Sequence, residues 1–279
     1  MISNISSLIN ISDKKFFTVP FPKEDELLSS WIVRVALAHD TLPWTFCNLH
    51  FPEHKNTVFA RDLDIWASKD FLEKLAYKSN IEYSKLLEMT LRSYEGYITK
   101  EIRSCTFNLN ISPLINRGRV NRGFGQKYCP LCLKEDEQPY FRKYWRLSFY
   151  NVCLKHKTIL LDRCKNCNKP ISLYKFKNER GYQYCWNCHV KLSENKTKYS
   201  TDEQFINTKR FINIVDSNCV IYRGNEINSL EFFLIYNELR RIIRKQYMQN
   251  LNPHSHTIKI EDNLKLINMF WVVFYNMNI

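Results

Sequence analysis

The chain has 279 residues and a net charge of +13, and 44% of its residues are hydrophobic. This apolar content excludes a disordered chain and supports one large domain or two to three small ones. The first residues lack the basic and apolar regions of a signal peptide, and the most apolar segment is too short to cross a membrane. We therefore expect a soluble, cytoplasmic protein.

The positive charge is concentrated in one third of the chain. Residues 1–113 carry a net charge of −1 and residues 201–279 carry +1, whereas residues 114–200 carry +13. A basic region of this size attracts polyanions, usually nucleic acid; a solubilising surface and an acidic protein partner are the alternatives. We predict three domains with these boundaries: a helical amino-terminal domain, a basic middle region and a helical carboxy-terminal domain.

The first helix is predicted from Glu26 to His39. Apolar residues recur along it at helical spacing, and Asp25 is expected to cap its amino terminus. Arg34 lies within the apolar stripe, so we expect it to form an ion pair inside the fold. A second short helix is expected over residues 43–51.

Residues 70–91 have the pattern of a helix-turn-helix. Asp70 is expected to cap the first helix, residues 79–81 form the turn, and the second helix runs to Leu91. Packing or dimer contacts explain this helix pair as well as DNA binding does, because the start of the second helix is not strongly basic. If it does bind DNA, the residues near the bases are Glu82, Tyr83, Ser84 and Lys85.

A basic segment rich in glycine leads into the middle region. Three of the six glycines lie between residues 112 and 129, and basic side chains then alternate with aromatic rings up to Tyr150. Cations in this setting can contact phosphate groups, while we expect most of the rings to form core. The predicted contacts with nucleic acid or a partner are Arg117, Arg119, Arg122, Lys127, Arg142, Lys143 and Arg146.

Seven of the ten cysteines lie in Cys-x-x-Cys or Cys-x-x-His pairs. Two ligands separated by two residues can bind one ion, and two such pairs complete a tetrahedron. Four protein ligands leave no open position for a catalytic water. The spacing predicts two structural Zn²⁺ ions, one bound by Cys129, Cys132, Cys153 and His156, the other by Cys164, Cys167, Cys185 and Cys188.

The cysteine pattern leaves other interpretations open. A redox pair would need a βαβ context that is not visible, and an iron–sulfur cluster fits a mixed Cys/His set less well than zinc does. The ligand pairs can also interleave along the chain, and His189 can stand in for Cys188. With helices expected over residues 202–216, 229–249 and 261–277, the predicted fold is mainly α with small β zinc ribbons.

Several stretches occur in an order that is known from one protein family. They are VPFPKEDELLSSWIVRVA, the helix end LEMTL…YEG, YCPLCLKED, YFRKYWRLSFYNVCLKHKTILLDRCKNCNKPI and YCWNCHVKL, between about Phe16 and Leu192. Together they resemble the TniQ/TnsD family of transposon target-selection proteins. The resemblance implies a helix-turn-helix, two zinc-binding modules and a non-catalytic role: choosing the insertion site and recruiting an AAA+ ATPase regulator, which then calls in the transposase.

The family has two branches. TnsD-like members bind a fixed chromosomal DNA site and carry a long carboxy-terminal extension, whereas shorter TniQ members of CRISPR-associated transposons join an RNA-guided effector complex, some as head-to-tail dimers. About 90 residues follow the second cysteine set here, which favours the effector-complex adaptor. The partners that this branch implies are target DNA or guide RNA, CRISPR effector subunits, the AAA+ regulator and a second copy, in a prokaryotic cytoplasm close to the nucleoid.

Two other classes of function are alternatives to this adaptor. A zinc-ribbon transcription regulator would share the metal chemistry but would bind a specific duplex without an ATPase partner. A nuclease would need clustered acidic metal ligands, and the six acids of residues 114–200 form no such cluster. We therefore expect no enzymatic activity.

Overall fold

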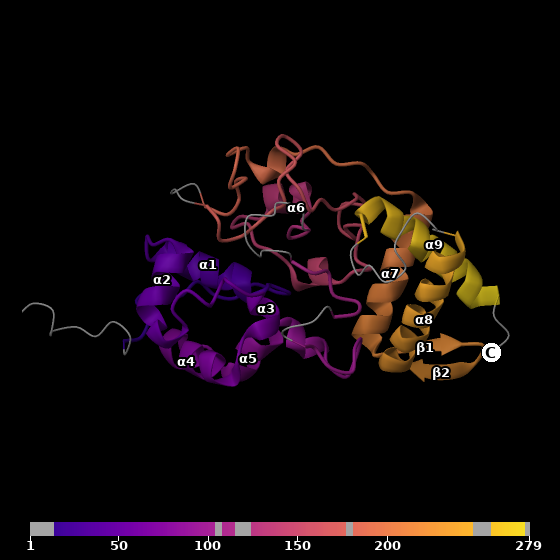
Figure 1. Ribbon diagram of the computed structural model, residues 1–279, viewed down its shortest axis with the longest axis horizontal. Coiled ribbons are helices and arrows are strands. Elements are labelled where there is room, and N and C mark those ends of the chain that lie inside the picture. The colour runs from indigo at the N-terminus through magenta and orange to yellow at the C-terminus, as the bar shows by residue number, and fades with distance from the viewer. Residues whose placement is uncertain (1–13, 104–107, 115–123, 177–180, 248–257, 277–279) are drawn as a thin grey trace, which may run out of the picture.

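The structure is a computed structural model that describes residues 14–103, 108–114, 124–176, 181–247 and 258–276. Within these ranges the chain is mainly helical, with one small antiparallel sheet. Figure 1 shows the first five helices on one side, the cysteine-rich segment above the centre and the last three helices on the other side. The helices are α1 (Leu28–Ala38), α2 (Pro43–His50), α3 (Leu63–Trp66), α4 (Lys69–Ser79), α5 (Tyr83–Glu88), α6 (Pro130–Glu135), α7 (Asp202–Ser217), α8 (Ser229–Tyr247) and α9 (Ile260–Asn276), with short 3-10 turns η2 (Pro52–His54), η3 (Leu91–Tyr94), η4 (Lys143–Arg146) and η5 (Leu192–Glu194).

Helix α1 begins two residues later than predicted. Its amino-terminal cap is Leu27, and Asp25 has a φ of 53°, so the prediction that Asp25 caps the helix is wrong. The Asp25 carboxylate instead accepts a hydrogen bond from the backbone N–H of Tyr144, at 3.1 Å, and burial raises its pKa to about 7. The predicted internal ion pair of Arg34 is confirmed, with its partner Glu26 at 2.6 Å.

The predicted helix-turn-helix region contains two helices joined by a tight turn. Ser68, not Asp70, caps α4 by accepting the N–H of Phe71, and Asn80 ends the helix in the left-handed region. Helix α5 is shorter than expected, because it ends at Glu88 and the chain enters η3 at Leu91. Contact of the α5 start with DNA stays a prediction.

The carboxy-terminal part contains a hairpin that the sequence reading missed. Strands β1 (Cys219–Tyr222) and β2 (Asn225–Asn228) pair between α7 and α8. The two residues of the turn, Arg223 and Gly224, both have positive φ, as the two-residue turns that match strand twist require. The three helices lie close to their predicted positions, and a capping box formed by Thr201 and Gln204 begins α7.

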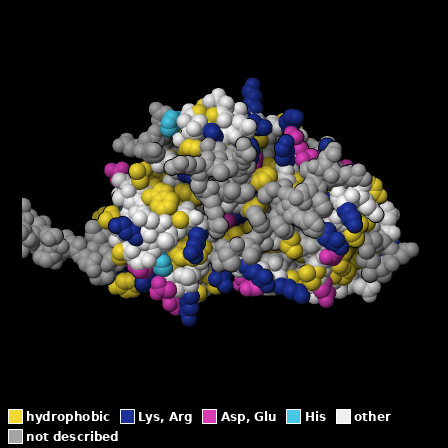
Figure 2. All heavy atoms as spheres, viewed as in Figure 1, with side chains coloured by type: hydrophobic (Ala, Val, Ile, Leu, Met, Phe, Trp, Pro, Cys, Tyr) yellow, Lys and Arg dark blue, Asp and Glu magenta, His cyan; other side chains and the backbone are white. Residues whose placement is uncertain are grey.

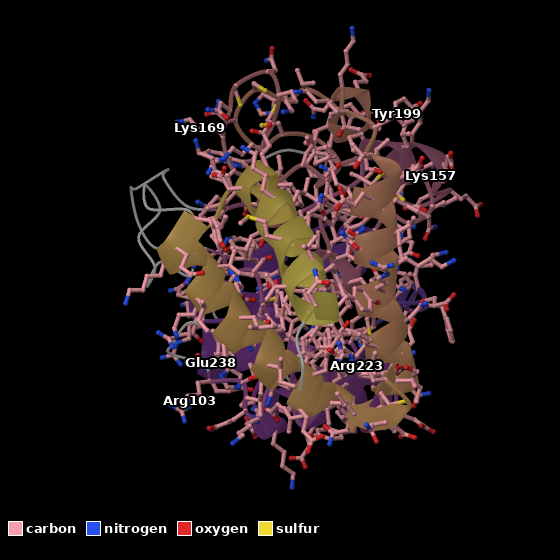
Figure 3. All side chains as sticks on the ribbon, turned by 90° about the vertical axis from the view of Figure 1, so that its right-hand side faces the viewer. Arg103, Lys157, Lys169, Tyr199, Arg223 and Glu238 are labelled. Carbon is pink, nitrogen blue, oxygen red and sulfur yellow. The ribbon has the colours of Figure 1, made fainter. Side chains whose placement is uncertain are left out.

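Stacked aromatic rings attach the middle of the chain to the last three helices. The ring of Phe149 lies 4.8 Å from that of Phe211 on α7 and 5.0 Å from that of Phe233 on α8, and Phe270 of α9 stacks on Phe211. Figures 1 and 3 show α9 packed beside α7 and α8. Such buried rings contribute large apolar areas, so they fix the helices against the cysteine-rich segment.

The first helix and the cysteine-rich segment are joined directly. Leu27 donates its N–H to the carbonyl of Phe141, at 2.9 Å, and Phe141 donates to the hydroxyl of Ser30, at 3.0 Å. One continuous hydrophobic cluster includes residues from all three predicted domains. Within the described ranges, no helix has both the length and the apolar character that a membrane span requires.

Candidate metal centres and basic surface

The first cysteine set is assembled by two turns that are far apart in the sequence. Cys129 precedes α6 and Cys132 lies in its first turn, where Pro130 occupies a position that needs no N–H donor. Cys153 and His156 lie on a second turn, which the N–H of Lys157 closes by donating to the Cys153 carbonyl at 2.8 Å. All three cysteines are buried, so the folded chain holds their sulfur atoms away from water.

The ligand atoms of this set have the spacing of a tetrahedral site. Nδ1 of His156 lies 3.5, 3.3 and 3.5 Å from the sulfurs of Cys129, Cys132 and Cys153. The sulfurs of Cys132 and Cys153 are 3.6 Å apart. Around an ion with bonds of about 2.0–2.3 Å, tetrahedral ligand atoms are separated by roughly 3.5–3.8 Å. The four side chains can therefore hold one metal ion with little rearrangement.

The other ring nitrogen of His156 faces a carboxylate. Nε2 lies 2.9 Å from Oε1 of Glu135, the last residue of α6, and the second oxygen of Glu135 pairs with Lys155 at 2.8 Å. Contacts to Lys155 and then to His156 lower the pKa of the Glu135 carboxyl. Nε2 makes no hydrogen bond of standard geometry to this carboxylate, but the negative charge at 2.9 Å favours the tautomer that carries its proton on Nε2 and turns the Nδ1 lone pair toward the sulfurs. The structure thus supplies a ligand set together with a residue that orients it.

Replacement of Glu135 by alanine is expected to weaken metal binding at the first set by about 10- to 100-fold, because His156 loses the partner that fixes its orientation. Competition with a graded series of chelators, followed by the metal retained per chain, measures the loss. Glu137→Ala is the matched control, since Glu137 is an exposed glutamate close by that is not part of the site. Equal retention by the two variants would contradict this role for Glu135.

The second set is built from two similar turns. The residue directly after each Cys-x-x-Cys pair has a positive φ, which is 55° at Asn168 and 60° at His189. Each of these residues donates its N–H to the backbone carbonyl of the first cysteine of its pair, at 2.9 Å in both cases. The chain then returns alongside itself through single bridges. The sulfurs of Cys164 and Cys188 are 3.5 Å apart, as are those of Cys167 and Cys185. This set can also hold a metal ion, and Cys167 and Cys188 are half-buried.

The geometry decides between the pairings that the sequence left open. The structure brings the ligands together in sequential pairs, in the two sets that the spacing indicated. His189 is exposed and occupies the position that turns the chain, so Cys188 is the ligand candidate. The predicted β-ribbons are reduced to isolated bridges in the described part of this segment, because the tight turns leave only one or two residues on each side to pair.

Arg146 lies in the core, so the prediction that it is a surface contact is wrong. Its side chain is fully buried and pairs with Asp62 at 2.5 Å and with Asp64 at 3.3 Å. Asp64 in turn accepts hydrogen bonds from the N–H and the hydroxyl of Ser29. Burial, followed by the charge of Asp62, raises the pKa of Asp64 to about 6, while Arg146 opposes the shift. This arginine joins η4 to the amino-terminal helices.

Lys127 is likewise an internal side chain and not a surface contact. Its Nζ donates to the carbonyls of Leu147 and Tyr150, both at 2.7 Å, and burial lowers its pKa to about 7. Arg142 and Lys143 are half-buried; Arg142 pairs with Asp136 and Lys143 donates to the Glu88 carbonyl. The remaining predicted contacts lie outside the described residues: Arg117, Arg119 and Arg122.

A different group of cations is exposed on the middle segment. Lys157 lies beside residues 196–199, because the Ser200 N–H donates to the Lys157 carbonyl and Thr158 bridges Tyr199. The group comprises Lys157, Lys196 and Lys198, and we call it the lysine edge. None of the three forms an ion pair with a described residue, and Tyr199 beside them is 77% exposed. Figure 3 shows Lys157 and Tyr199 close together at one edge, and Figure 2 shows basic side chains along the upper edge of the molecule.

The sequence contained a signal for the lysine edge that was not used. The run Lys196–Thr197–Lys198 places two cations on one side of an extended chain, because alternate residues of a strand share a face. What the sequence did not show is that Lys157 lies beside this run, since that contact depends on the turn after His156.

Comparison with known proteins adds one finding. The family model TniQ matches residues 17–160, which is more than half of the chain. The match includes the whole first ligand set and ends before the second one. No curated protein matches the sequence.

Proposed function

This chain belongs to the TniQ family of transposition target-selection proteins, and from that membership we propose that it is an adaptor that links a target-recognition complex to an AAA+ transposition regulator. The family match is the observation that carries the proposal, because it covers α1 to α6 and the complete first ligand set. We propose an RNA-guided CRISPR effector as the recognition complex, in line with the start of α5, which is not strongly basic and so suits protein contacts better than DNA binding.

We propose that both ligand sets bind Zn²⁺ with a structural role. Thiolates and imidazole with tetrahedral spacing favour zinc over the harder metals, which prefer oxygen ligands. Each set uses four side chains of the protein, so a bound ion would have no open position for substrate or water. The ions then hold the turns in place, and the adaptor acts by binding its partners.

We propose that the lysine edge contacts nucleic acid. Its three lysines carry no ion pair with a described residue, and Lys157 contacts only the ring of Phe205, at 5.1 Å, among the contacts that the structure describes. Their charge can therefore reach phosphate groups, and the exposed ring of Tyr199 can stack on a base. The edge belongs to the segment that carries the excess positive charge of the chain. Arg142 and Lys143 contribute less, since they are half-buried and already hydrogen-bonded.

A binding experiment tests this surface. Replacing Lys157, Lys196 and Lys198 together by alanine is expected to weaken binding of an unstructured oligonucleotide. The slope of the logarithm of the binding constant against the logarithm of the salt concentration should fall by the contribution of about three phosphate contacts. The matched control replaces Lys55, Lys69 and Lys100, which are exposed on the amino-terminal part, and changes the net charge equally. An equal loss in both triple variants would show that overall charge, not this edge, binds the strand.

The adaptor role is tested separately by reconstitution. Purified chain, AAA+ regulator and effector complex are expected to form one assembly by size-exclusion chromatography, and insertion at the guided site is expected to fail without the chain. Insertion at a fixed chromosomal site without any guide, accompanied by tight binding of that duplex by the chain alone, would instead favour a TnsD-like protein. Unchanged guided insertion without the chain would overturn the proposal.

A further inference from the structure

A small cavity lies between the cysteine-rich segment and the last two helices. It has a volume of about 40 Å³. A single water needs roughly 10–15 Å³ of such space, so the cavity has room for about three waters or one small oxyanion. Its lining comes from three parts of the chain: the residues on either side of the 115–123 segment, the loop around Ser148, and helices α8 and α9.

Several polar atoms of the lining lack a hydrogen-bond partner among the residues that the structure describes. Arg240 of α8 is only 9% exposed, and its Nε has no acceptor. Ser148 has a buried hydroxyl that makes no hydrogen bond, although the Ser148 carbonyl accepts from Asn263 at 2.6 Å. Buried polar groups in folded proteins are nearly always satisfied, so these atoms indicate a missing polar partner.

The charge of Arg240 is the strongest part of this observation. A guanidinium stays protonated even when buried, and an unpaired buried charge is costly. Among the described residues no carboxylate lies within ion-pair distance of Arg240; its guanidinium carbon is 6.0 Å from the ring of Tyr236. One turn further along α8, burial and the charge of Arg240 lower the pKa of Arg244. Of these two arginines, Arg240 is the one that lines the cavity.

Among the described lining residues, the one carboxylate is already engaged. Asp162 lies 3.7 Å from Arg163, and its carboxyl interacts with the backbone N–H of Gly125. Lys127, also in the lining, directs its ammonium at two carbonyls and at Asn151. Neither residue neutralises Arg240.

We propose that this cavity binds a phosphate oxyanion, with Arg240 as its principal ligand and the hydroxyl of Ser148 as a second donor. A planar guanidinium presents two parallel N–H groups to an oxyanion, which makes arginine well suited to such a ligand. The oxyanion can be a phosphodiester of a nucleic-acid strand or a free phosphate group. Both share the chemistry that the cavity recognises, and the site is separate from the lysine edge and from the two metal-ligand sets.

Inorganic phosphate is the probe for the site. At constant ionic strength, maintained with sodium chloride, phosphate is expected to raise the melting temperature of the zinc-loaded full chain in a saturable way. Arg240→Gln is expected to raise the phosphate concentration that gives half of this effect about tenfold or more. Arg240→Lys is expected to raise it less, because lysine keeps the positive charge but loses the two parallel N–H groups. The matched control is Arg241→Gln, on the exposed side of the same helix, where Arg241 pairs with Glu238.

An oligonucleotide without terminal phosphates distinguishes the two sources of the ligand. If the strand displaces phosphate from the wild type and binds Arg240→Gln more weakly, the site is supported with a backbone phosphodiester as its ligand. If phosphate binds but the strand does not displace it, the site is supported with a free phosphate group as its ligand.

Two results would overturn the inference. One is the absence of any phosphate effect on the wild type, combined with a higher melting temperature of Arg240→Gln, which would mean that the cavity holds only water around an unfavourable charge. The other is an equal phosphate effect in wild type, Arg240→Gln and Arg241→Gln. Circular dichroism and zinc content of each variant show whether it folds, and Arg240→Lys carries the test if Arg240→Gln does not. The adaptor role and the lysine edge would be unaffected by either result.

Discussion

Replacing Cys132 by serine is expected to reduce bound zinc from two ions per chain to one and to remove the cooperative thermal transition of the protein. Cys132 is buried within the hydrophobic cluster that includes residues from all three predicted domains, and its sulfur lies 3.6 Å from that of Cys153. Apparent binding free energies of structural zinc are about 10–16 kcal/mol, as large as the whole stability of a typical domain. Elemental analysis and calorimetry measure the two effects.

A cysteine of the second ligand set should show a smaller effect on the thermal transition, and a cysteine outside both sets serves as the control. Cys188→Ser is expected to lose one ion as well but to retain a transition, because Cys188 is half-buried, whereas Cys132 is buried in the hydrophobic cluster. Cys219→Ser removes a thiol in β1 that belongs to neither set, so both ions should remain. Two retained ions in Cys132→Ser, with an unchanged transition, would refute the structural role of the first set.

The second large effect is expected at the buried arginine of η4. Arg146→Ala should lower the free energy of unfolding by about 3–5 kcal/mol, because it leaves Asp64 buried without its cation. Denaturant titration measures the loss. Arg103→Ala is the control: its pair with Glu101 is mostly exposed, and Figure 3 shows Arg103 at the periphery, so the loss should stay below about 1 kcal/mol.

The effect at Arg146 should also depend on pH. The pKa of Asp64 is raised to about 6 in the folded protein, from an ordinary value of 3.8, so the folded state holds an extra proton between these values. Stability contributed by this group therefore falls as the pH rises through that window. Without Arg146 the pKa rises further, so Arg146→Ala should lose more stability at pH 8 than at pH 4.5. A loss independent of pH would show that packing, not the buried charge, dominates. Adding Asp64→Asn to Arg146→Ala should recover part of the loss at pH 8.

Local patterns of the sequence predicted the ligand sets well. A Cys-x-x-Cys pair forms its turn from four consecutive residues, and the next residue, Asn168 or His189, completes the turn with a positive φ. The turn is therefore set by five neighbouring residues and needs no distant partner. The long helices were predicted for the same reason, because apolar spacing along a single segment is a local property. The pairing of the turns needed the structure, since it depends on residues more than 20 positions apart.

Predictions that depend on distant partners were the ones that failed. Counting charge marked Arg146 and Lys127 as surface cations, but the aspartates that bind Arg146 lie more than 80 residues away and the acceptors of Lys127 are backbone carbonyls. Asp25 failed as a cap because Tyr144 uses its carboxylate. The hairpin after α7 was missed because its strands have only four residues each, although Gly224 marked the turn.

The joint between the first helix and residues 141–146 has a mechanical consequence. Leu27 and Ser30 are bonded to Phe141 at one point, and Arg146 holds Asp62 and Asp64 at a second. Together with the hydrogen bond from the Lys143 N–H to the Asp25 carbonyl, these points oppose rotation as well as translation of the amino-terminal helices relative to the cysteine-rich segment. The Ile159 N–H also donates to the Lys198 carbonyl, so the lysine edge is fixed to the same segment. A nucleic acid bound at the lysine edge would therefore be held at a constant distance from α1.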